Sequence, residues 1–178
     1  METERQRDTA WERDRRQGLA GDKVLQQVAG ILKAAGRLTD SVVRWGGEEF
    51  LLIARNTGPD SAPVLARRIR QAFKRHVFDV SDGVKLQLTC SMGWACYPFI
   101  PSDCGVLGWE EVVGVADKAL YAAKNSGRDS WVGLISTAKT PEDYLYKLIR
   151  ADVPGLLSAG ELSVLASIEE QGDITWES

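Results

Sequence analysis

The chain has 178 residues, a formal net charge of −3 and 44% hydrophobic residues, which is enough to bury the core of one domain with an appendage. So small a charge excludes a basic field over the whole protein, and we expect no polynucleotide partner. The apolar stretches are far shorter than the roughly 20 residues that span a bilayer, and the charged N-terminus lacks the apolar core of a signal peptide. We therefore predict no membrane segment and a cytoplasmic location.

Cysteine and histidine are few. The three cysteines have no metal-ligand spacing and the chain has one histidine, which argues against a disulfide framework or a zinc site. Cys90 and Cys96 are predicted to lie in strands as small hydrophobic side chains. His76 follows a basic helix and is predicted to face solvent.

The first half of the chain begins with a polar segment. Residues 2–17 are almost wholly charged or polar, which predicts a frayed helix or a mobile arm. Apolar residues at helical spacing then predict a helix from Asp22, whose side chain can cap its start, to Gly36. Two apolar runs that flank Gly46-Gly47-Glu48-Glu49 predict a β-hairpin with the glycines in its turn.

The second half alternates helices with strands. Helices are predicted at about 61–75 and 109–126, and strands in a hairpin around 81–83, through 86–97 and over 130–135. Thr140-Pro141-Glu142-Asp143 has the composition of a helix start and opens a C-terminal tail. In that tail we predict helices near 141–150 and 158–170.

This order of elements predicts an α+β sandwich, in which helices flank a mainly antiparallel sheet. Such an order normally requires a strand ahead of the first helix, and the sequence there shows no strand pattern. Ile174-Thr175-Trp176 is a candidate replacement strand.

The segment Gly46-Gly47-Glu48-Glu49 carries the most chemistry. Two glycines let a phosphate or a base approach the backbone closely, and two adjacent carboxylates on a tight turn can hold Mg²⁺ through oxygen ligands. A solvated hairpin turn with no ligand explains the same residues equally well. The motif alone leaves both alternatives open.

Other segments resolve this choice, because the chain resembles the GGDEF family from Gly21 to about Trp131. The matching motifs are Gly21-Asp22-Lys23-Val24-Leu25, Arg37-Leu38-Thr39-Asp40, Ser91-Met92-Gly93-Trp94-Ala95 and the long run from Ala116 to Asp129. The resemblance implies a nucleotidyl-cyclase or ferredoxin-like fold. It also implies three parts: a charged arm over 1–20 in place of the family's first strand, a GGDEF domain over 21–135 and a helical tail over 136–178.

The family joins two GTP molecules into cyclic di-GMP, with one GTP on each subunit of an antiparallel pair, so the resemblance implies GTP, Mg²⁺ and a homodimer. It assigns metal binding and deprotonation of the attacking hydroxyl to Glu48, with Glu49 supporting the metal. Gly46 and Gly47 would lie against the nucleotide.

Three further residues would complete the GTP site. The resemblance gives guanine binding to Asp22 and triphosphate binding to Lys124 and Arg128. A helix cap for Asp22, and cations that complement the helix dipole for the other two, are compatible alternatives.

Arg37 and Asp40 match the family's inhibitory-site RxxD, which binds the product cyclic di-GMP. An arginine fork fits the O6 and N7 edge of guanine or a phosphate, and a carboxylate accepts from guanine N1 and N2. A third contact would come from an arginine of the next helix, with Arg68 as the first candidate and Arg67 as the second. A local salt bridge is the alternative explanation of the pair.

The pattern breaks ahead of Gly21. Counting back from Asp22 without gaps, Arg5 takes the place of the first metal-binding aspartate and Ala10 that of the transition-state lysine. An arginine there sets like charge against the cation, and Asp8 could replace the ligand only with a rearranged backbone.

Three functions remain open at this point. The first, which we favour, is a cyclic di-GMP-binding module with a degenerate or truncated N-terminal segment and impaired diguanylate cyclase chemistry. The second is an active cyclase whose N-terminal ligands come from another alignment or from a partner chain. The third is an interaction scaffold that binds neither nucleotide. The intact RxxD argues against the third function and the altered N-terminal segment argues against the second.

Overall fold

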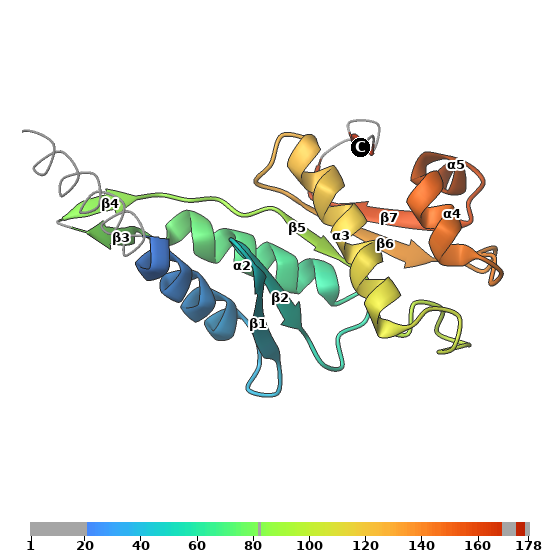
Figure 1. Ribbon diagram of the computed structural model, residues 1–178, viewed down its shortest axis with the longest axis horizontal. Helices are drawn as coiled ribbons and strands as arrows, with labels where there is room; N and C mark the ends of the chain where they lie inside the picture. Colours follow the sequence, from blue (N-terminus) through green and yellow to red (C-terminus); the bar gives the residue numbers. More distant parts are fainter. Residues whose placement is uncertain (1–20, 82, 169–173, 177–178) are drawn as a thin grey trace, which may run out of the picture. The chain divides into compact units, whose positions relative to one another are not determined.

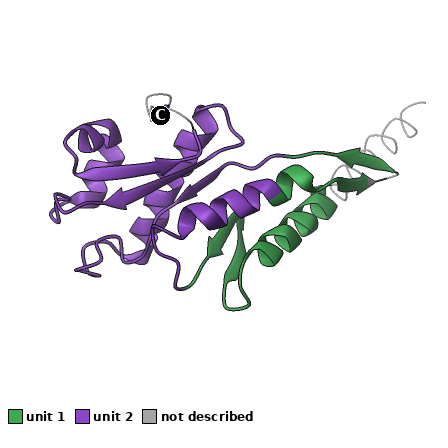
Figure 2. Ribbon diagram, turned by 180° about the vertical axis from the view of Figure 1, so that it is seen from behind, with its two compact units in different colours: residues 1–55, 72–88 green, residues 56–71, 89–178 purple. Residues whose placement is uncertain are grey.

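The computed structural model describes residues 21–81, 83–168 and 174–176, and the predicted arm over 1–20 lies outside them. The chain divides into two compact units, residues 1–55 with 72–88 (unit 1) and residues 56–71 with 89–178 (unit 2), shown in Figure 2. Figure 1 labels the helices and strands. Helix α2 (Ala62–Arg75) begins in unit 2 and ends in unit 1.

The described residues of unit 1 form a helix, the last turn of a second helix and two hairpins. Its elements are a helix over 21–35, β1 (Ser41–Gly46), β2 (Glu49–Ile53), the last turn of α2, β3 (Phe78–Ser81) and β4 (Val84–Leu86). The predicted hairpin is confirmed, since β1 pairs antiparallel with β2 and Val43 lies opposite Leu51. Gly47 sits in the turn with a φ of 52°, a conformation that glycine adopts without strain.

The helix over 21–35 buries the side chains that the periodicity selects, Ile31, Leu32 and Ala35. One detail of the prediction is wrong. Residue 21 is already helical, so Asp22 lies inside the helix and does not cap its start.

His76 does not face solvent as predicted. Its ring is half-buried, with Nε2 3.1 Å from Gln27 Oε1 and its edge against Phe78 at 4.5 Å between ring centroids. The basic side chains before it misled the prediction, because they describe the outer face of α2 and His76 follows the end of that helix.

Unit 2 contains the largest core. Its elements are the first part of α2, β5 (Met92–Trp94), α3 (Trp109–Asn125), β6 (Trp131–Ser136), α4 (Leu145–Ala151), α5 (Val153–Ser158) and β7 (Leu162–Ala166). In the sheet β5-β6-β7, β5 runs parallel to β6 and β7 runs antiparallel to it. Figure 1 shows α3 lying against this sheet.

Glycine makes the contact between α3 and β5 possible. A Cβ on Gly93 would collide with the backbone of Ala116 and Leu120 in α3. Side chains alternate along a strand, so the next residue, Trp94, faces the opposite way and covers Gly133 of β6, where a Cβ would strike the indole. One face of the sheet therefore packs against α3 at Gly93, and Trp94 covers the other face at Gly133.

The C-terminal tail differs from the prediction. Residues 162–166 form β7 and not a helix, since Leu162 and Val164 are buried while Ser163 and Leu165 are exposed, a period of two. Helix α4 begins at Leu145, later than Thr140, whose hydroxyl instead donates to the backbone carbonyl of Glu161.

Three shorter predictions are also corrected. Residues 174–176 form no strand, although Ile174 and Trp176 are buried in the core of unit 2. Of the strand predicted through 86–97, only residue 86, the end of β4, and residues 92–94, which form β5, belong to strands. Cys90 and Cys96 therefore lie outside strands, although both are half-buried.

The predicted α+β class is confirmed, because helices combine with three antiparallel strand pairings and one parallel pairing. None of the helices within the described ranges is long and apolar enough to cross a membrane.

Candidate functional site

The tip of the β1–β2 hairpin is open around its glycines. A Cβ added to Gly46 or Gly47 would meet no atom within 4 Å. Arg44 Nε donates a hydrogen bond of 3.0 Å to the carbonyl of Gly47, which fixes the turn from one side. The backbone at the tip is therefore held by one hydrogen bond and accessible to a ligand.

The two carboxylates next to this turn differ in exposure. Glu48 lies in the turn and is exposed, while Glu49 begins β2 and is half-buried. In the described part of the chain, no group of three acidic, histidine or cysteine side chains could hold a metal ion. Glu48 and Glu49 alone do not fit the set of six oxygen ligands that Mg²⁺ requires.

The RxxD segment follows the helix over 21–35 and forms an ordered loop. Asp40 Oδ2 accepts the backbone N–H of Arg37 at 2.7 Å, and Asp40 Oδ1 accepts the backbone N–H of Arg55 at 3.0 Å. The backbone N–H of Asp40 in turn donates to the carbonyl of Arg37 at 3.0 Å. One carboxylate thus fixes two arginine backbones in unit 1.

Arg55 was missed by the sequence interpretation. The hairpin register pairs Ser41 with Ile53, which brings the residues after β2 beside the loop before β1. That register was the one signal that could have placed Arg55 next to Asp40. Both Arg37 and Arg55 are exposed.

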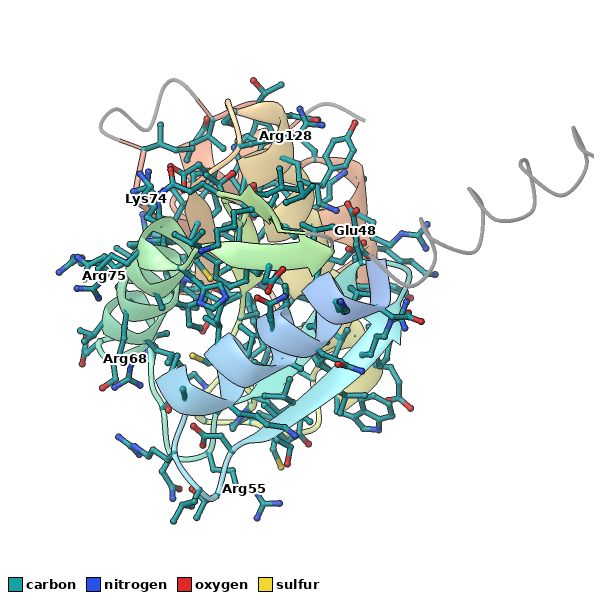
Figure 3. All side chains as sticks on the ribbon, turned by 90° about the vertical axis from the view of Figure 1, so that its left-hand side faces the viewer. Glu48, Arg55, Arg68, Lys74, Arg75 and Arg128 are labelled. Carbon is teal, nitrogen blue, oxygen red and sulfur yellow. The ribbon has the colours of Figure 1, made fainter. Side chains whose placement is uncertain are left out.

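Arg67 and Arg68 lie on α2 and are both exposed, and Figure 3 shows Arg68 pointing away from the helix. They belong to unit 2, whereas Arg37 and Asp40 belong to unit 1. Their joining into one binding site stays a prediction. The same holds for Asp22 in unit 1, which is exposed on the helix over 21–35.

The cations predicted to hold the triphosphate lie at the end of α3. Lys124 is in its last turn, and Arg128 follows two residues after the C-cap Ser126. Gly127, Arg128 and Asp129 have φ values of 95°, 59° and 44°, so three consecutive residues are left-handed. Arg128 is exposed, as Figure 3 shows, while Lys124 is half-buried.

The side chain of Asp129, the residue after Arg128, forms an ion pair with Arg70 of α2. Arg70 Nε and Nη2 donate to the two oxygens of Asp129 at 3.0 and 2.9 Å. This pair raises the pKa of Arg70, chiefly through the hydrogen bond to Asp129. Burial raises the pKa of the neighbouring Cys90 thiol to about 12, with Asp129 adding to the rise and Arg70 opposing it.

Comparison with known proteins identifies the family. The profile described as "Diguanylate cyclase, GGDEF domain" matches residues 14–130. The chain belongs to the GGDEF family. The predicted recognition is confirmed, and Arg5 and Ala10 lie ahead of the matched residues.

Two relatives illustrate the similarity. The chain is 38% identical over 110 residues to "Diguanylate cyclase A" of Treponema denticola, covering 62% of this chain and 28% of that protein. It is 40% identical over 111 residues to "Diguanylate cyclase DgcP" of Pseudomonas aeruginosa, covering 62% of this chain and 16% of that protein. The chain therefore spans less than a third of either relative.

Among solved structures, the chain is similar to the diguanylate cyclase SiaD of Pseudomonas aeruginosa, crystallised in complex with its activator SiaC. The sequence identity is 31% and the TM-score 0.47, over 61% of this chain and 39% of that chain.

Proposed function

We propose that this GGDEF domain binds cyclic di-GMP at the loop of Arg37 and Asp40, and that its diguanylate cyclase activity is impaired. The observation that carries the proposal is the double hydrogen bond of Asp40, which fixes the backbones of Arg37 and Arg55 around one carboxylate. A loop held in this way presents two exposed arginines without the entropic cost of ordering it on binding.

Both residues of the loop have groups that suit guanine. The Asp40 carboxylate is an acceptor for guanine N1–H and N2–H, while the exposed Arg37 suits guanine O6 and N7 or a phosphate. Arg68, or else Arg67, would add a charged contact from α2.

Impaired catalysis rests on the metal ligands. Glu48 and Glu49 supply two carboxylates, and the positions at which the family pattern places a third metal ligand and the transition-state lysine hold Arg5 and Ala10. An arginine repels the cation that a carboxylate would bind.

Nucleotide binding does not require catalysis. We propose that Lys124 and Arg128 still bind the phosphates of GTP, with Gly46 and Gly47 leaving room for the nucleotide at the hairpin tip and Asp22 contacting guanine. The relatives named as diguanylate cyclases support this assignment for the family's shared motif.

Isothermal titration with cyclic di-GMP tests the proposal. Arg37→Ala removes hydrogen bonds from a charged donor, each worth about 1.5–3 kcal/mol, so binding should weaken roughly ten- to a hundredfold. Arg37→Lys is the matched control, since it keeps the charge and loses the fork, and it should fall between Arg37→Ala and the wild type.

Glu48→Ala is the second control and should bind cyclic di-GMP like the wild type, because it lies at the hairpin tip and not in the RxxD loop. The proposal is wrong if the wild type shows no heat at high micromolar ligand. It is also wrong if Glu48→Ala abolishes binding while Arg37→Ala does not.

A further inference from the structure

An ion pair of unit 2 lies directly beside Arg128 in the sequence. Arg70 on α2 and Asp129 after α3 form a two-pronged pair, with Nε to Oδ1 at 3.0 Å and Nη2 to Oδ2 at 2.9 Å. Their side chains are 31% and 24% exposed. A paired arginine fork fixes the orientation of a carboxylate as well as its position, which a single hydrogen bond does not.

The segment that carries Asp129 would not hold its conformation unaided. Arg128 and Asp129 are left-handed, with φ values of 59° and 44°, directly after the left-handed Gly127. For residues other than glycine this conformation costs on the order of 1–2 kcal/mol each, and it persists where the surroundings enforce it.

Two contacts enforce it from the α3 side. The backbone N–H of Arg128 donates to the carbonyl of Ala123 at 3.2 Å. The hydroxyl of the buried Ser130 donates to the same carbonyl at 3.2 Å. These bonds fix the two residues that flank Asp129, and the Arg70 pair fixes the side chain of Asp129 itself.

We propose that Arg70 is a positioning residue for nucleotide phosphates: by holding Asp129, it keeps Arg128 in the left-handed conformation that directs the Arg128 guanidinium to the phosphate site. Arg70 does not touch the nucleotide in this scheme. The inference rests on the proposed GTP site of Lys124 and Arg128. It explains how the segment that follows α3 orients the Arg128 side chain.

Arg70 is well suited to this task among the arginines of α2. Three other arginines of this helix are exposed, namely Arg67, Arg68 and Arg75. Arg70 is half-buried, and its guanidinium donates two hydrogen bonds to Asp129. The hydrogen bond to Asp129 raises the pKa of Arg70, which favours the charged form of its guanidinium.

Titration of GTP with Mg²⁺ into four proteins tests the inference. Arg70→Ala removes the pair, and Asp129→Asn removes its charge while keeping a residue that tolerates the left-handed region. Both should weaken GTP binding roughly five- to twentyfold. Arg75→Ala, which removes an exposed arginine of the same helix, should bind GTP like the wild type.

Three readouts separate positioning from a loss of folding. Cyclic di-GMP affinity should be unchanged in Arg70→Ala and Asp129→Asn. Amide hydrogen exchange should speed up at 127–130 and stay slow in the first half of α3. Arg70→Lys, which keeps the charge, should recover part of the GTP affinity.

The outcomes distinguish the inference from the proposed function. If the wild type binds GTP and both Arg70→Ala and Asp129→Asn bind it equally well, the positioning role is wrong and the GTP site stands. If the wild type binds no GTP, the nucleotide half of the proposed function is wrong and the positioning role falls with it. Loss of cyclic di-GMP binding in both variants would show a structural role and would also overturn the inference.

Discussion

Two loops of this protein place an exposed arginine close to an aspartate, one in each compact unit, and they use the aspartate differently. In the RxxD loop, Asp40 accepts backbone amides from Arg37 and Arg55 and fixes the main chain directly. At the exit of α3, Asp129 accepts the side chain of Arg70, and the main chain is fixed through that pair. The first device is local, while the second depends on packing between α2 and the end of α3.

The difference bears on what each loop can bind. The Asp40 carboxylate holds the backbone of the RxxD loop, while the Arg37 side chain is exposed and can donate to a purine or a phosphate. The carboxylate of Asp129 is neutralised by Arg70, which leaves a net positive Arg128 beside it. We therefore expect a site that binds guanine in unit 1 and a site that binds phosphate in unit 2.

Catalysis should show the largest effect. With GTP and Mg²⁺, turnover to cyclic di-GMP should be at or below about a thousandth of that of a competent cyclase, because electrostatic groups of this kind are each worth roughly 10²–10³ in rate. Product formation measured by chromatography checks this. Robust turnover that disappears in Glu48→Ala would contradict the impaired-cyclase proposal and support the active-enzyme alternative.

The thiol beside the Arg70–Asp129 pair gives the next largest effect. The pKa of Cys90 is raised from 9.0 to about 12, so its thiolate is scarce at pH 8. Iodoacetamide should modify it on the order of ten- to a hundredfold more slowly than the exposed Cys104, after allowing for the higher reactivity of a more basic thiolate. Mass spectrometry of the alkylated peptides measures this, and equal rates would contradict the described packing.

The same thiol links stability to pH. Its folded pKa lies above its unfolded value, so its contribution is complete below about pH 9 and declines as pH rises toward 12. Asp129→Asn removes a cause of the rise and should lower the pKa of Cys90, whereas Arg70→Ala should raise it. Opposite shifts in the pH profile of alkylation would confirm that the pair encloses this thiol.

The hairpin and the long helices could be predicted from sequence because their signals are local. The glycines of the hairpin turn and the helical spacing in α3 lie within single segments, and the structure reproduces both. The tail strand β7 was missed because five residues of alternating burial are too short to outweigh a helix-forming composition. Antiparallel pairing with β6 supplies the backbone hydrogen bonds that stabilise this segment as a strand.

The site could be predicted residue by residue but not as a set of contacts. Motifs name Arg37, Asp40, Lys124 and Arg128, yet the Asp40 bond to Arg55 joins positions 15 residues apart. The Arg70–Asp129 pair joins positions 59 apart. The first pairing follows only from the register of the β1–β2 hairpin. No periodicity or spacing encodes the second, because it depends on how α2 packs against the end of α3.

Removing the Asp40 carboxylate should affect stability as well as binding, which sharpens the comparison. Asp40→Ala leaves two backbone amides without their partner and should lower the free energy of unfolding by about 1–3 kcal/mol. Arg37→Ala, which leaves that carboxylate in place, should change stability by less than about 0.5 kcal/mol. Urea unfolding measures both. Equal stability of the two variants would mean that Asp40 does not fix the loop.

Arg55 should give the smallest effect. Its backbone is held by Asp40 and its side chain is exposed, so its charge acts on a ligand through screened electrostatics. Arg55→Ala should weaken cyclic di-GMP binding about two- to fivefold, and raising the salt concentration should shrink that difference. A loss as large as that of Arg37→Ala would make Arg55 a direct ligand contact.

The most direct test of the two-loop account is a crossed titration, in which wild type, Arg37→Ala and Arg128→Ala are each titrated with cyclic di-GMP and with GTP in Mg²⁺. The account predicts that Arg37→Ala weakens cyclic di-GMP binding roughly ten- to a hundredfold and leaves GTP binding unchanged, and that Arg128→Ala does the reverse. If each variant weakens both ligands by the same factor, the two loops form one site and the division of labour between them is wrong.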